Sequence, residues 1–251
     1  MIIRKLCDNS REYGEIDSTN EEMSRLLGKE ELEEGTVVRT NYQSRGKGHQ
    51  ENTWVSERGM NLLFSILLKP EFLPAEDAFF LSRIVSLSLV DIIDKQGIRR
   101  HIKWPNDILV GTGKICGILI ENSILRDRIS HSVIGVGLNV NQKKFDAGIP
   151  DPTSMLLEKG CQFGMNLLLN GFRSALEGWY QVLQSGHKDQ IMDAYLKNLY
   201  LLKEPAEFSD QGGVFTASII GVLPSGELEV LLEGGEIRRY GFKEIEYLRP
   251  V

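Results

Sequence analysis

Cysteine is scarce in this 251-residue chain, and the three that occur, Cys7, Cys116 and Cys161, are widely spaced without a C-x-x-C pair. Such spacing predicts neither a disulfide framework nor a zinc site, and it favours a reducing cytoplasm. No apolar run approaches the roughly 20 residues that cross a membrane, and the N-terminus lacks the apolar core of a signal peptide. We therefore expect a cytoplasmic protein that does not bind membranes.

An excess of positive charge is also missing. The chain has 29 Lys and Arg against 35 Asp and Glu, which gives a net charge of −6. Proteins that bind nucleic acid usually carry a basic surface, and no basic recognition helix is visible. DNA is therefore not an expected partner, and a local basic patch becomes more informative because the overall charge does not explain it.

Several segments have the pattern of a helix or a strand. Ser18 with Glu21 forms a capping box that predicts a helix ending near Leu27, whereas residues 8–17 are a polar lead-in. Helical spacing of apolar residues predicts further helices over 81–92, 168–183 and 191–199. Strand formers and apolar runs predict strands over 37–42, 62–68, 100–104, 108–110, 114–121 and 132–140.

The order of these segments predicts the fold class. Helices and a hairpin-rich mixed sheet alternate without a regular βαβ rhythm, so an α+β fold with helices packed on the sheet is favoured. Residues 1–203 are expected to form this first domain, with a proline- and glycine-punctuated connection over 143–160. Residues 204–251 carry closely spaced strands and tight turns, which predict a small C-terminal β-barrel domain.

A glycine-spaced basic stretch, Gln43 to Trp54, contains the first candidate for binding chemistry. Its glycines let backbone N–H groups approach a ligand, Arg45 and Lys47 supply positive charge, and Trp54 offers a flat face. A basic surface loop before a strand would have the same composition. The stretch alone therefore indicates an anion-binding loop only weakly.

Polar residues at predicted strand ends strengthen this interpretation: Lys103, Asn106, Asp107, Lys114 and Asn139. If the strands are neighbours, these side chains gather on one rim of the sheet and face the loop. Cations neutralise phosphate, the indole stacks on a base, and a carboxylate binds a hydroxyl, a magnesium ion or an amine. Taken singly, each residue has a plainer role as a surface charge, a turn former or a partner of the backbone.

Five short motifs follow one another along the chain. They are Ser18-Thr19-Asn20; Gln43 with Arg45-Gly46-Lys47-Gly48-His49 and Trp54; Lys103-Trp104-Pro105-Asn106-Asp107; Lys114 to Glu121; and Gly135 to Asn139. In this order they resemble the biotin protein ligase family, also called biotin–[acetyl-CoA-carboxylase] ligases. The third motif is similar to the family's K-W-P-N-D without change, and the fourth follows it as K-x-x-G-I-L-x-E. The resemblance covers nearly the whole chain.

The resemblance implies a fold and a set of binding residues. The expected catalytic domain is like that of class II synthetases. Biotin would bind at Ser18, Thr19, Asn20, Gln43, Gly46, Lys47, Gly48, His49, Lys114 and Gly117. ATP would bind at Arg45, Lys47, Trp54, Lys103, Asn106, Asp107, Lys114 and Asn139. The catalytic residues would be Lys114, Asp107 and Arg45, and metal ligands are not assigned.

The same resemblance implies the reaction. Biotin and ATP, with Mg²⁺, would form biotinyl-5′-adenylate, and a lysine of a biotin carboxyl carrier protein would then accept the biotinyl group. The loop departs from the family pattern at Lys47, His49 and Glu51, where arginine and glycine are usual. The chain begins at the catalytic domain, so we expect no DNA-binding domain or repressor role.

Three alternatives stay open at this point. A lipoate–protein ligase would share the fold and the chemistry, although the unbroken K-W-P-N-D motif argues against it. A non-catalytic module that holds biotin or a nucleotide would tolerate the altered loop. A homodimer is also open, on the expectation that residues 132–139 form an exposed edge of the sheet.

Overall fold

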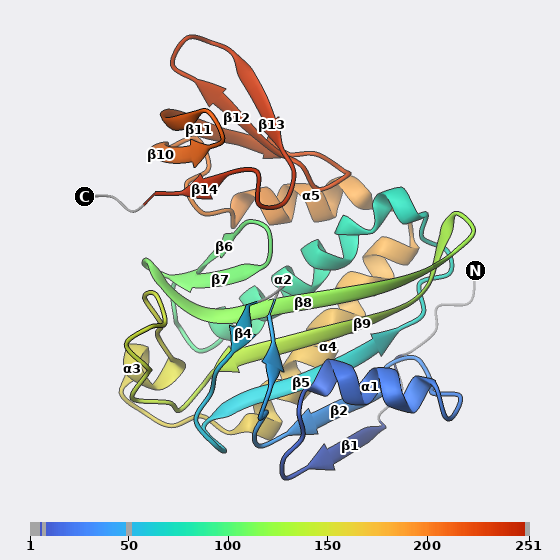
Figure 1. The fold of residues 1–251 in the computed structure, drawn as a ribbon. Helices are drawn as coiled ribbons and strands as arrows, with labels where there is room; N and C mark the ends of the chain where they lie inside the picture. Colours follow the sequence, from blue (N-terminus) through green and yellow to red (C-terminus); the bar gives the residue numbers. More distant parts are fainter. Residues whose placement is uncertain (1–5, 7–8, 49–51, 249–251) are drawn as a thin grey trace.

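The computed structural model describes residue 6 and residues 9–48 and 52–248. Its main layer is a seven-stranded sheet with strand order β1-β2-β5-β9-β8-β7-β6 (Figure 1). The pair β1 and β2 is parallel, and the other neighbours are antiparallel. The strands are β1 Ser10–Tyr13, β2 Val37–Thr40, β5 Asn61–Leu68, β6 His101–Lys103, β7 Asp107–Val110, β8 Gly113–Leu125 and β9 Arg128–Asn139.

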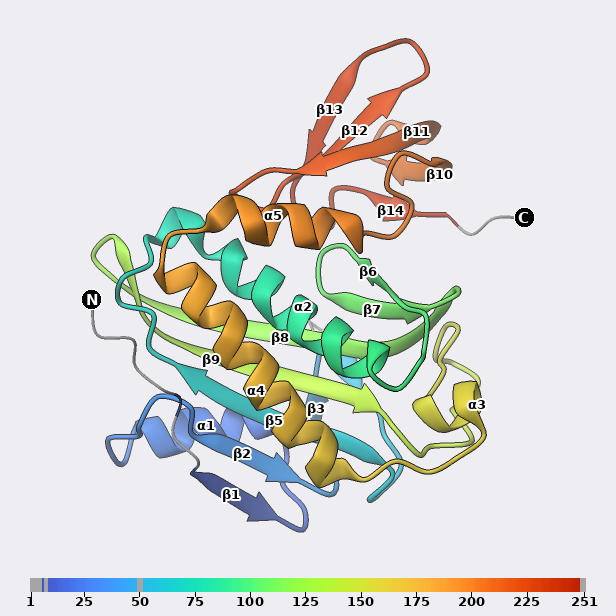
Figure 2. The same ribbon diagram turned by 180° about the vertical axis from the view of Figure 1, so that it is seen from behind.

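Helices cover both faces of this sheet. One face carries α2 (Phe79–Asp94) and α4 (Met165–Gln184), with α5 (Lys188–Lys197) beside them (Figure 2). The other face carries α1 (Thr19–Leu27) and a two-stranded hairpin of β3 (Gly46–Lys47) and β4 (Thr53–Trp54) (Figure 1).

Covering both faces buries the central strands. All eight residues of β5 are buried, and Phe64 on this strand meets Phe172 of α4 at 5.0 Å between ring centroids. On the opposite face a smaller apolar cluster joins Met23 of α1 to Val38 and Leu67. The continuous apolar run of β5 follows from this position, because each of its faces needs apolar side chains.

The C-terminal segment forms a second sheet with order β13-β12-β11-β10-β14, antiparallel throughout. Its strands are β10 Pro205–Asp210, β11 Gly213–Val222, β12 Leu228–Leu232, β13 Ile237–Tyr240 and β14 Glu246–Tyr247. Among the described residues this sheet is open: β13 and β14 lie at its two edges and do not pair. The α+β class is confirmed. The predicted small C-terminal β-barrel is present as an antiparallel sheet that does not close into a barrel among the described residues. The domain boundary at 203 stays a prediction.

Two local predictions were wrong. The lead-in over 8–17 contains the edge strand β1, which pairs with β2 over only four residues and so has little sequence signal. The connection over 143–160 contains the short helix α3 (Met155–Lys159), whose first turn is capped by Ser154 Oγ accepting from Leu157 N at 3.2 Å. The 3₁₀ turn η1 (Ala75–Asp77), for which there was no prediction, precedes α2.

The predicted capping box at the start of α1 is also wrong, although the helix is present. Ser18 occupies the N-cap position, but its side chain makes no capping hydrogen bond. Glu21 forms an ion pair with Lys47 of the loop instead of turning back to the helix start. The charge of Lys47 provides a stronger partner for this carboxylate than a backbone N–H would.

The predicted exposed edge over residues 132–139 is wrong as well. This segment belongs to β9, which pairs with β5 on one side and with β8 on the other. The edges of the main sheet are β1 and β6. The pairing of a strand depends on distant segments, so the hairpin of β8 and β9 could not reveal that β5 covers its other side.

Candidate functional site

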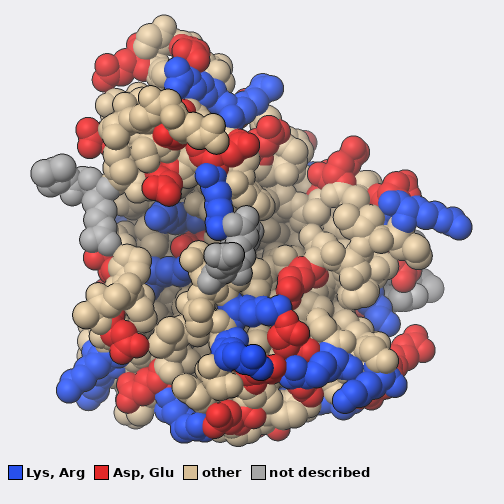
Figure 3. All heavy atoms as spheres, in the orientation of Figure 1, with Lys and Arg blue, Asp and Glu red and all other residues tan. Residues whose placement is uncertain are grey.

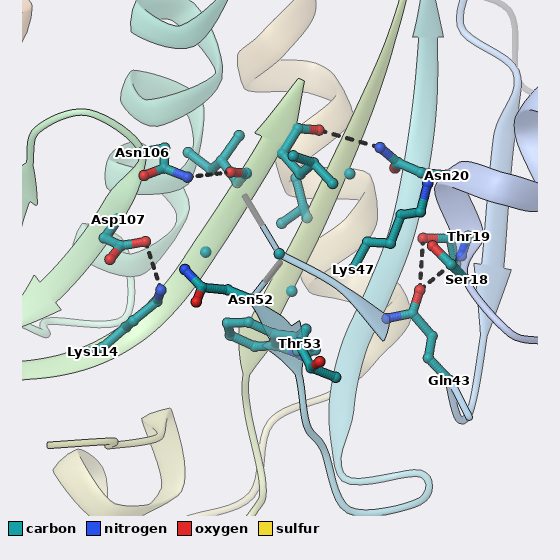
Figure 4. Close-up of a pocket in the computed structure, with 18 residues that line it drawn as sticks. Ser18, Thr19, Asn20, Gln43, Lys47, Asn52, Thr53, Asn106, Asp107 and Lys114 are labelled. Carbon is teal, nitrogen blue, oxygen red and sulfur yellow. Dashed lines mark hydrogen bonds and ion pairs between the residues drawn. The ribbon is translucent and has the colours of Figure 1, made fainter. Parts of the chain in front are cut away.

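A cavity of about 150 Å³ lies on the face of the main sheet that carries α1 and the β3–β4 hairpin (Figure 4). Residues from five separate parts of the chain line it. They are Ser18, Thr19, Asn20, Gln43, Lys47, Gly48, Asn52, Thr53, Trp54, Asn106, Asp107, Lys114, Gly117, Ile118, Leu119, Gly135, Val136 and Gly137. The sheet therefore brings the predicted motifs together, as the sequence led us to expect.

The floor of the cavity is made of glycine backbone. Gly117 of β8 and Gly137 of β9 lie under the indole of Trp54, and a Cβ added at Gly117 would be 2.9 Å from Trp54 Cζ3. A Cβ at Gly137 would overlap the indole, and one at Gly135 would overlap the amide of Asn20. These glycines are needed because flat groups sit directly on the strands.

One end of the cavity is lined by the hydroxyl and amide side chains of Thr19, Asn20 and Gln43, with Lys47 beside them (Figure 4). Thr19 donates its backbone N–H to Gln43 Oε1 at 2.7 Å, and Thr19 Oγ1 lies 3.1 Å from the same oxygen. Asn20 donates from Nδ2 to Glu121 Oε2 at 2.7 Å. These side chains are held in defined orientations at the start of α1, which suits recognition of a polar, uncharged ring.

The other end carries an ion pair. Lys114 Nζ lies 2.8 Å from Asp107 Oδ1, and Figure 4 shows this pair across the cavity from Thr19 and Gln43. The pair forms because β7 and β8 are antiparallel neighbours that run from the turn at Gly111. Asn106 is fixed beside it by donating from Nδ2 to Ile118 O at 2.7 Å. The lysine faces Trp54, with Nζ 5.8 Å from the ring centroid.

The loop cations pair with carboxylates near α1. Lys47 forms its ion pair with Glu21, and its Nζ lies 3.9 Å from Glu121 Oε1. The hydrogen bond to Glu21 raises the pKa of Lys47. Arg45 is 84% exposed at its side chain and lies 3.9 Å from Asp17. Over this face of the molecule, positive and negative side chains are intermixed (Figure 3).

A second cavity, of about 340 Å³, adjoins the first. Both cavities are lined by Asn52, Thr53, Trp54 and Lys114, and the second also has Asn139 and an apolar wall of Phe145, Ile149, Pro150 and Pro152. Asn139 donates from Nδ2 to Thr153 O at 3.0 Å. Within the described residues, Asn139 Oδ1 and Trp54 Nε1 are buried without a hydrogen-bond partner. Two buried polar atoms thus lack partners around the same indole and are available to a ligand or a water.

The predicted site residues do not all reach the first cavity. Arg45 and Gly46 line an outer pocket near Asp17, and Asn139 lines the second cavity. Lys103 turns away toward the C-terminal sheet, where its Nζ lies 5.0 Å from the ring centroid of Tyr247. His49 lies outside the described residues. The remaining predicted binding residues line the first cavity, and the role of each stays a prediction.

Several lining residues had not been singled out from the sequence. Asn52 and Thr53 belong to the glycine-spaced stretch from Gln43 to Trp54, and Gly137 belongs to the motif from Gly135 to Asn139, so the sequence pointed to their segments. Phe145 and Ile149 lie in the proline-punctuated connection, which carried no motif. The described residues contain no group of three or more His, Cys, Asp or Glu side chains that could hold a metal ion. In the same part of the chain, no helix is long and apolar enough to cross a membrane.

Comparison with known proteins agrees with this geometry. The family model described as the biotin/lipoate A/B protein ligase family matches residues 14–139, half of the chain. The chain belongs to this family, and the predicted resemblance is thereby confirmed.

Individual relatives carry related names. The bifunctional ligase/repressor BirA of Bacillus subtilis is 33% identical over 135 residues, which cover 53% of this chain and 41% of that protein. The biotin–[acetyl-CoA-carboxylase] ligase of Paracoccus denitrificans is 29% identical over 196 residues, or 75% of this chain and 80% of its own. The matched segment therefore spans about two fifths of the length of the Bacillus subtilis protein.

Among solved structures, the biotin protein ligase from Aquifex aeolicus in complex with biotin and ATP superposes with a TM-score of 0.80. The superposition covers 97% of this chain and all of that one, at 24% sequence identity. At this identity the likeness establishes the shared fold.

Proposed function

We propose that this chain is an ATP-dependent biotin–protein ligase. It activates biotin as biotinyl-5′-adenylate and transfers the biotinyl group to a lysine of a biotin carboxyl carrier protein. One observation carries the proposal: a polar cavity and a larger, partly apolar cavity meet at Lys114 and Trp54. A ligand made of a polar ring, an acyl phosphate and a nucleoside fits this arrangement. The names of the relatives support the same substrates.

Each cavity receives one half of the adenylate. The polar end at Thr19, Asn20 and Gln43 takes the ureido ring of biotin, and the valeryl chain lies over the glycine floor. The second cavity takes the adenosine, with Asn139 Oδ1 accepting from a ligand donor. The indole of Trp54, shared by both cavities, covers the junction and keeps water from the reactive anhydride.

In the first half-reaction the biotin carboxylate attacks the α-phosphate of ATP, and pyrophosphate leaves. Both reactants are anions, so the barrier consists largely of charge repulsion and positioning. Lys114 Nζ lies at the junction of the two cavities, where it can contact the carboxylate and the α-phosphate together. Its ion pair with Asp107 holds the ammonium group in place before the substrates arrive.

Mg²⁺ is part of the proposal as the counter-ion of the ATP phosphates, where it supplies positive charge. The residues at the junction fit a cation that is carried mainly by the nucleotide. Asp107 is the carboxylate that faces the junction, and it is already paired with Lys114. The loop cations Arg45 and Lys47 would add charge on the phosphates after leaving Asp17 and Glu21.

In the second half-reaction a carrier lysine attacks the carbonyl carbon of the mixed anhydride. An amide bond forms, the bond to phosphate oxygen breaks, and AMP leaves. A lysine has an unperturbed pKa of about 10.4, so its ammonium must lose a proton before attack. Asp107 is positioned to orient the incoming amine and to accept that proton.

A lipoate–protein ligase is the nearest alternative, since the family includes both activities by name. Offering biotin and lipoate in competition, with the carrier domains of each, decides between the two. Pyrophosphate release with biotin and ATP separates either enzyme from a non-catalytic binding module. We also propose cytoplasmic location, a catalytic domain ending near residue 203, and the carrier domain of acetyl-CoA carboxylase or another biotin-dependent carboxylase as the acceptor.

The direct test is mass spectrometry of a biotin carboxyl carrier domain after incubation with this protein, ATP, Mg²⁺ and biotin. A mass increase corresponding to one biotinyl group is expected, and an unmodified carrier domain would contradict the proposal.

Lys114→Ala tests the central residue of the first half-reaction. Adenylate formation should fall by about 100-fold or more, because a preorganised charge at the reacting atoms is lost. The matched control is Lys188→Ala, which removes an ion pair of similar exposure, with Asp77 at 2.6 Å, outside both cavities. The control should release pyrophosphate at the wild-type rate. If Lys114→Ala formed adenylate as fast as the control, Lys114 would not be the central residue of this step.

Asp107→Asn tests the second half-reaction separately. Preformed biotinyl-adenylate is supplied, and transfer to the carrier domain is followed by mass. Transfer should slow about 100-fold, in the range of a lost general base. Transfer at the wild-type rate would exclude Asp107 as the group that receives the proton.

A further inference from the structure

The polar end of the first cavity is held from below by a side chain that does not line it. Ser65 lies in the middle of β5 and is fully buried. Its Oγ lies 2.6 Å from Asn20 Oδ1 and 2.8 Å from Thr19 Oγ1. One hydroxyl group from the central strand therefore reaches two consecutive residues at the start of α1.

The partners of Asn20 show what this hydroxyl does. Asn20 Nδ2 donates to Glu121 Oε2 at 2.7 Å, and a carboxylate can only accept, so the orientation of the amide is determined. Its oxygen then faces Ser65. Because that oxygen cannot donate, the single hydroxyl hydrogen of Ser65 goes to Asn20, and Ser65 Oγ remains an acceptor for the Thr19 hydroxyl.

The same set of hydrogen bonds continues to the loop. Thr19 donates its backbone N–H to Gln43 Oε1 at 2.7 Å. Its single hydroxyl hydrogen points to Ser65 Oγ, the nearer acceptor at 2.8 Å, while Gln43 Oε1 lies 3.1 Å from Thr19 Oγ1. Beneath Asn20, a Cβ at Gly135 would overlap the amide, so the amide has no room to move toward the sheet. The run from Glu121 through Asn20, Ser65 and Thr19 to Gln43 therefore sets which atoms donate and which accept at this end.

We propose that Ser65 is a positioning residue that makes this cavity selective for acids bearing a ureido ring. The inference rests on the proposed function, because it concerns how the same site chooses its acid. A site whose donors and acceptors are fixed in place rejects a ligand that cannot pair with them, since those groups would be left buried and unsatisfied. Without the hydroxyl, Asn20 and Thr19 lose their common partner. The cavity should then bind acids with a ureido ring less tightly, while its affinity for acids without the ring stays the same.

The test compares ligands with and without that ring. Biotin and desthiobiotin both carry the ureido group, whereas octanoate has a carboxylate on a plain hydrocarbon chain. In Ser65→Ala the KM for biotin and for desthiobiotin should rise about tenfold, the effect of one lost hydrogen bond of about 1.4 kcal/mol. The inhibition constant of octanoate and the KM for ATP should stay within about twofold of wild type.

Ser86→Ala is the matched control. Ser86 is equally buried, on α2, and its Oγ has no hydrogen-bond partner within the described residues. Its removal should leave all four constants unchanged. A second pair of variants isolates the hydroxyl from side-chain volume: Ser65→Thr keeps the hydroxyl and Ser65→Val replaces it with a methyl group. Selectivity should be retained in the first and lost in the second.

Equal losses for biotin, octanoate and ATP would show a general structural effect and overturn the inference, as would a Ser65→Val variant as selective as Ser65→Thr. A wild-type protein that releases no pyrophosphate with biotin would instead overturn the proposed function, and this inference with it. The two failures are therefore distinguishable in one set of measurements.

Discussion

Asp17 connects the charged side chains around the start of α1. Arg25 donates to both of its carboxylate oxygens, at 2.6 and 2.9 Å, and Ser18 N donates to Oδ1 at 2.8 Å. The hydrogen bonds from Arg25 in particular hold the pKa of Asp17 below its ordinary value of 3.8. A carboxyl whose folded pKa is depressed stabilises the fold above its unfolded pKa, and that contribution is lost as the pH falls through the lower, folded value.

This predicts a pH-dependent difference between wild type and Asp17→Asn. Above about pH 5 the variant should unfold at a lower denaturant concentration than wild type. As the pH falls below the ordinary pKa of the group toward its lower folded value, the two unfolding midpoints should approach each other. Chemical denaturation at several pH values measures the difference. Arg25→Gln removes the other half of the pair and should converge with wild type in the same window. A gap that stays constant down to pH 2 would contradict this origin of the stability.

At the scale of single elements, β8 and β9 form a side-chain-free surface beneath the indole of β4. Gly137→Ala tests that surface, because its Cβ would overlap Trp54 and displace the ring. The KM for ATP should rise about tenfold or more, whereas the free energy of unfolding should change by about 1 kcal/mol or less, since the ring lies in a cavity outside the core. Steady-state kinetics and chemical denaturation together check both parts.

Gly178→Ala is the control for this substitution. Gly178 lies in α4, is exposed, and an added Cβ would have nothing within 4 Å. Alanine in a helix interior should stabilise the protein by roughly 0.5–1 kcal/mol without altering either KM. A wild-type KM for ATP in Gly137→Ala would show that ATP binding does not depend on the position of the Trp54 ring against Gly137.

At the scale of the whole molecule, the turn between β11 and β12 joins the C-terminal sheet to the site. Arg83 of α2 is buried and donates to three carbonyls of that turn region: Val222 at 3.1 Å, Leu223 at 2.6 Å and Pro224 at 3.3 Å. Burial lowers the pKa of Arg83 to about 10. Further along the same turn, the carbonyl oxygen of Gly226 accepts a hydrogen bond from Trp104 Nε1 at 2.8 Å. Trp104 is the tryptophan of the K-W-P-N-D motif.

Trp104→Phe should therefore affect the site from a distance. The ring is kept and the N–H is lost, so Asn106 and Asp107 are held less firmly, and the KM for ATP should rise about three- to tenfold. Trp179→Phe is the matched control, since it loses an indole hydrogen bond of the same 2.8 Å length, to Asp91 on the far helical layer. Both variants should lose similar stability in chemical denaturation. If the KM for ATP rose in both variants, or in neither, the hydrogen bond between Trp104 and Gly226 would not connect the C-terminal sheet to the site.

Much of the fold follows from local sequence. The apolar run of β5, the helical spacing of α2 and the glycine turn before β8 each encode their structure within one segment, because periodicity and turn chemistry act over a few residues. The motifs for the site were equally visible, and 14–139 belongs to a known family on sequence alone. Short elements with few pairing residues, such as β1 and α3, were missed.

Which of these segments meet was decided only by the tertiary structure. Strand order placed β9 inside the sheet and put Ser65 beneath Asn20. Both strands were predicted from their own residues, but their neighbours were not. The tertiary structure likewise decided where each side chain points: Lys103 points toward Tyr247, whereas Lys114 faces the cavity. Pairing and orientation depend on contacts between segments far apart in the chain. The sequence by itself therefore determined the elements and the chemistry they carry, and the packing of the sheet determined which groups act together.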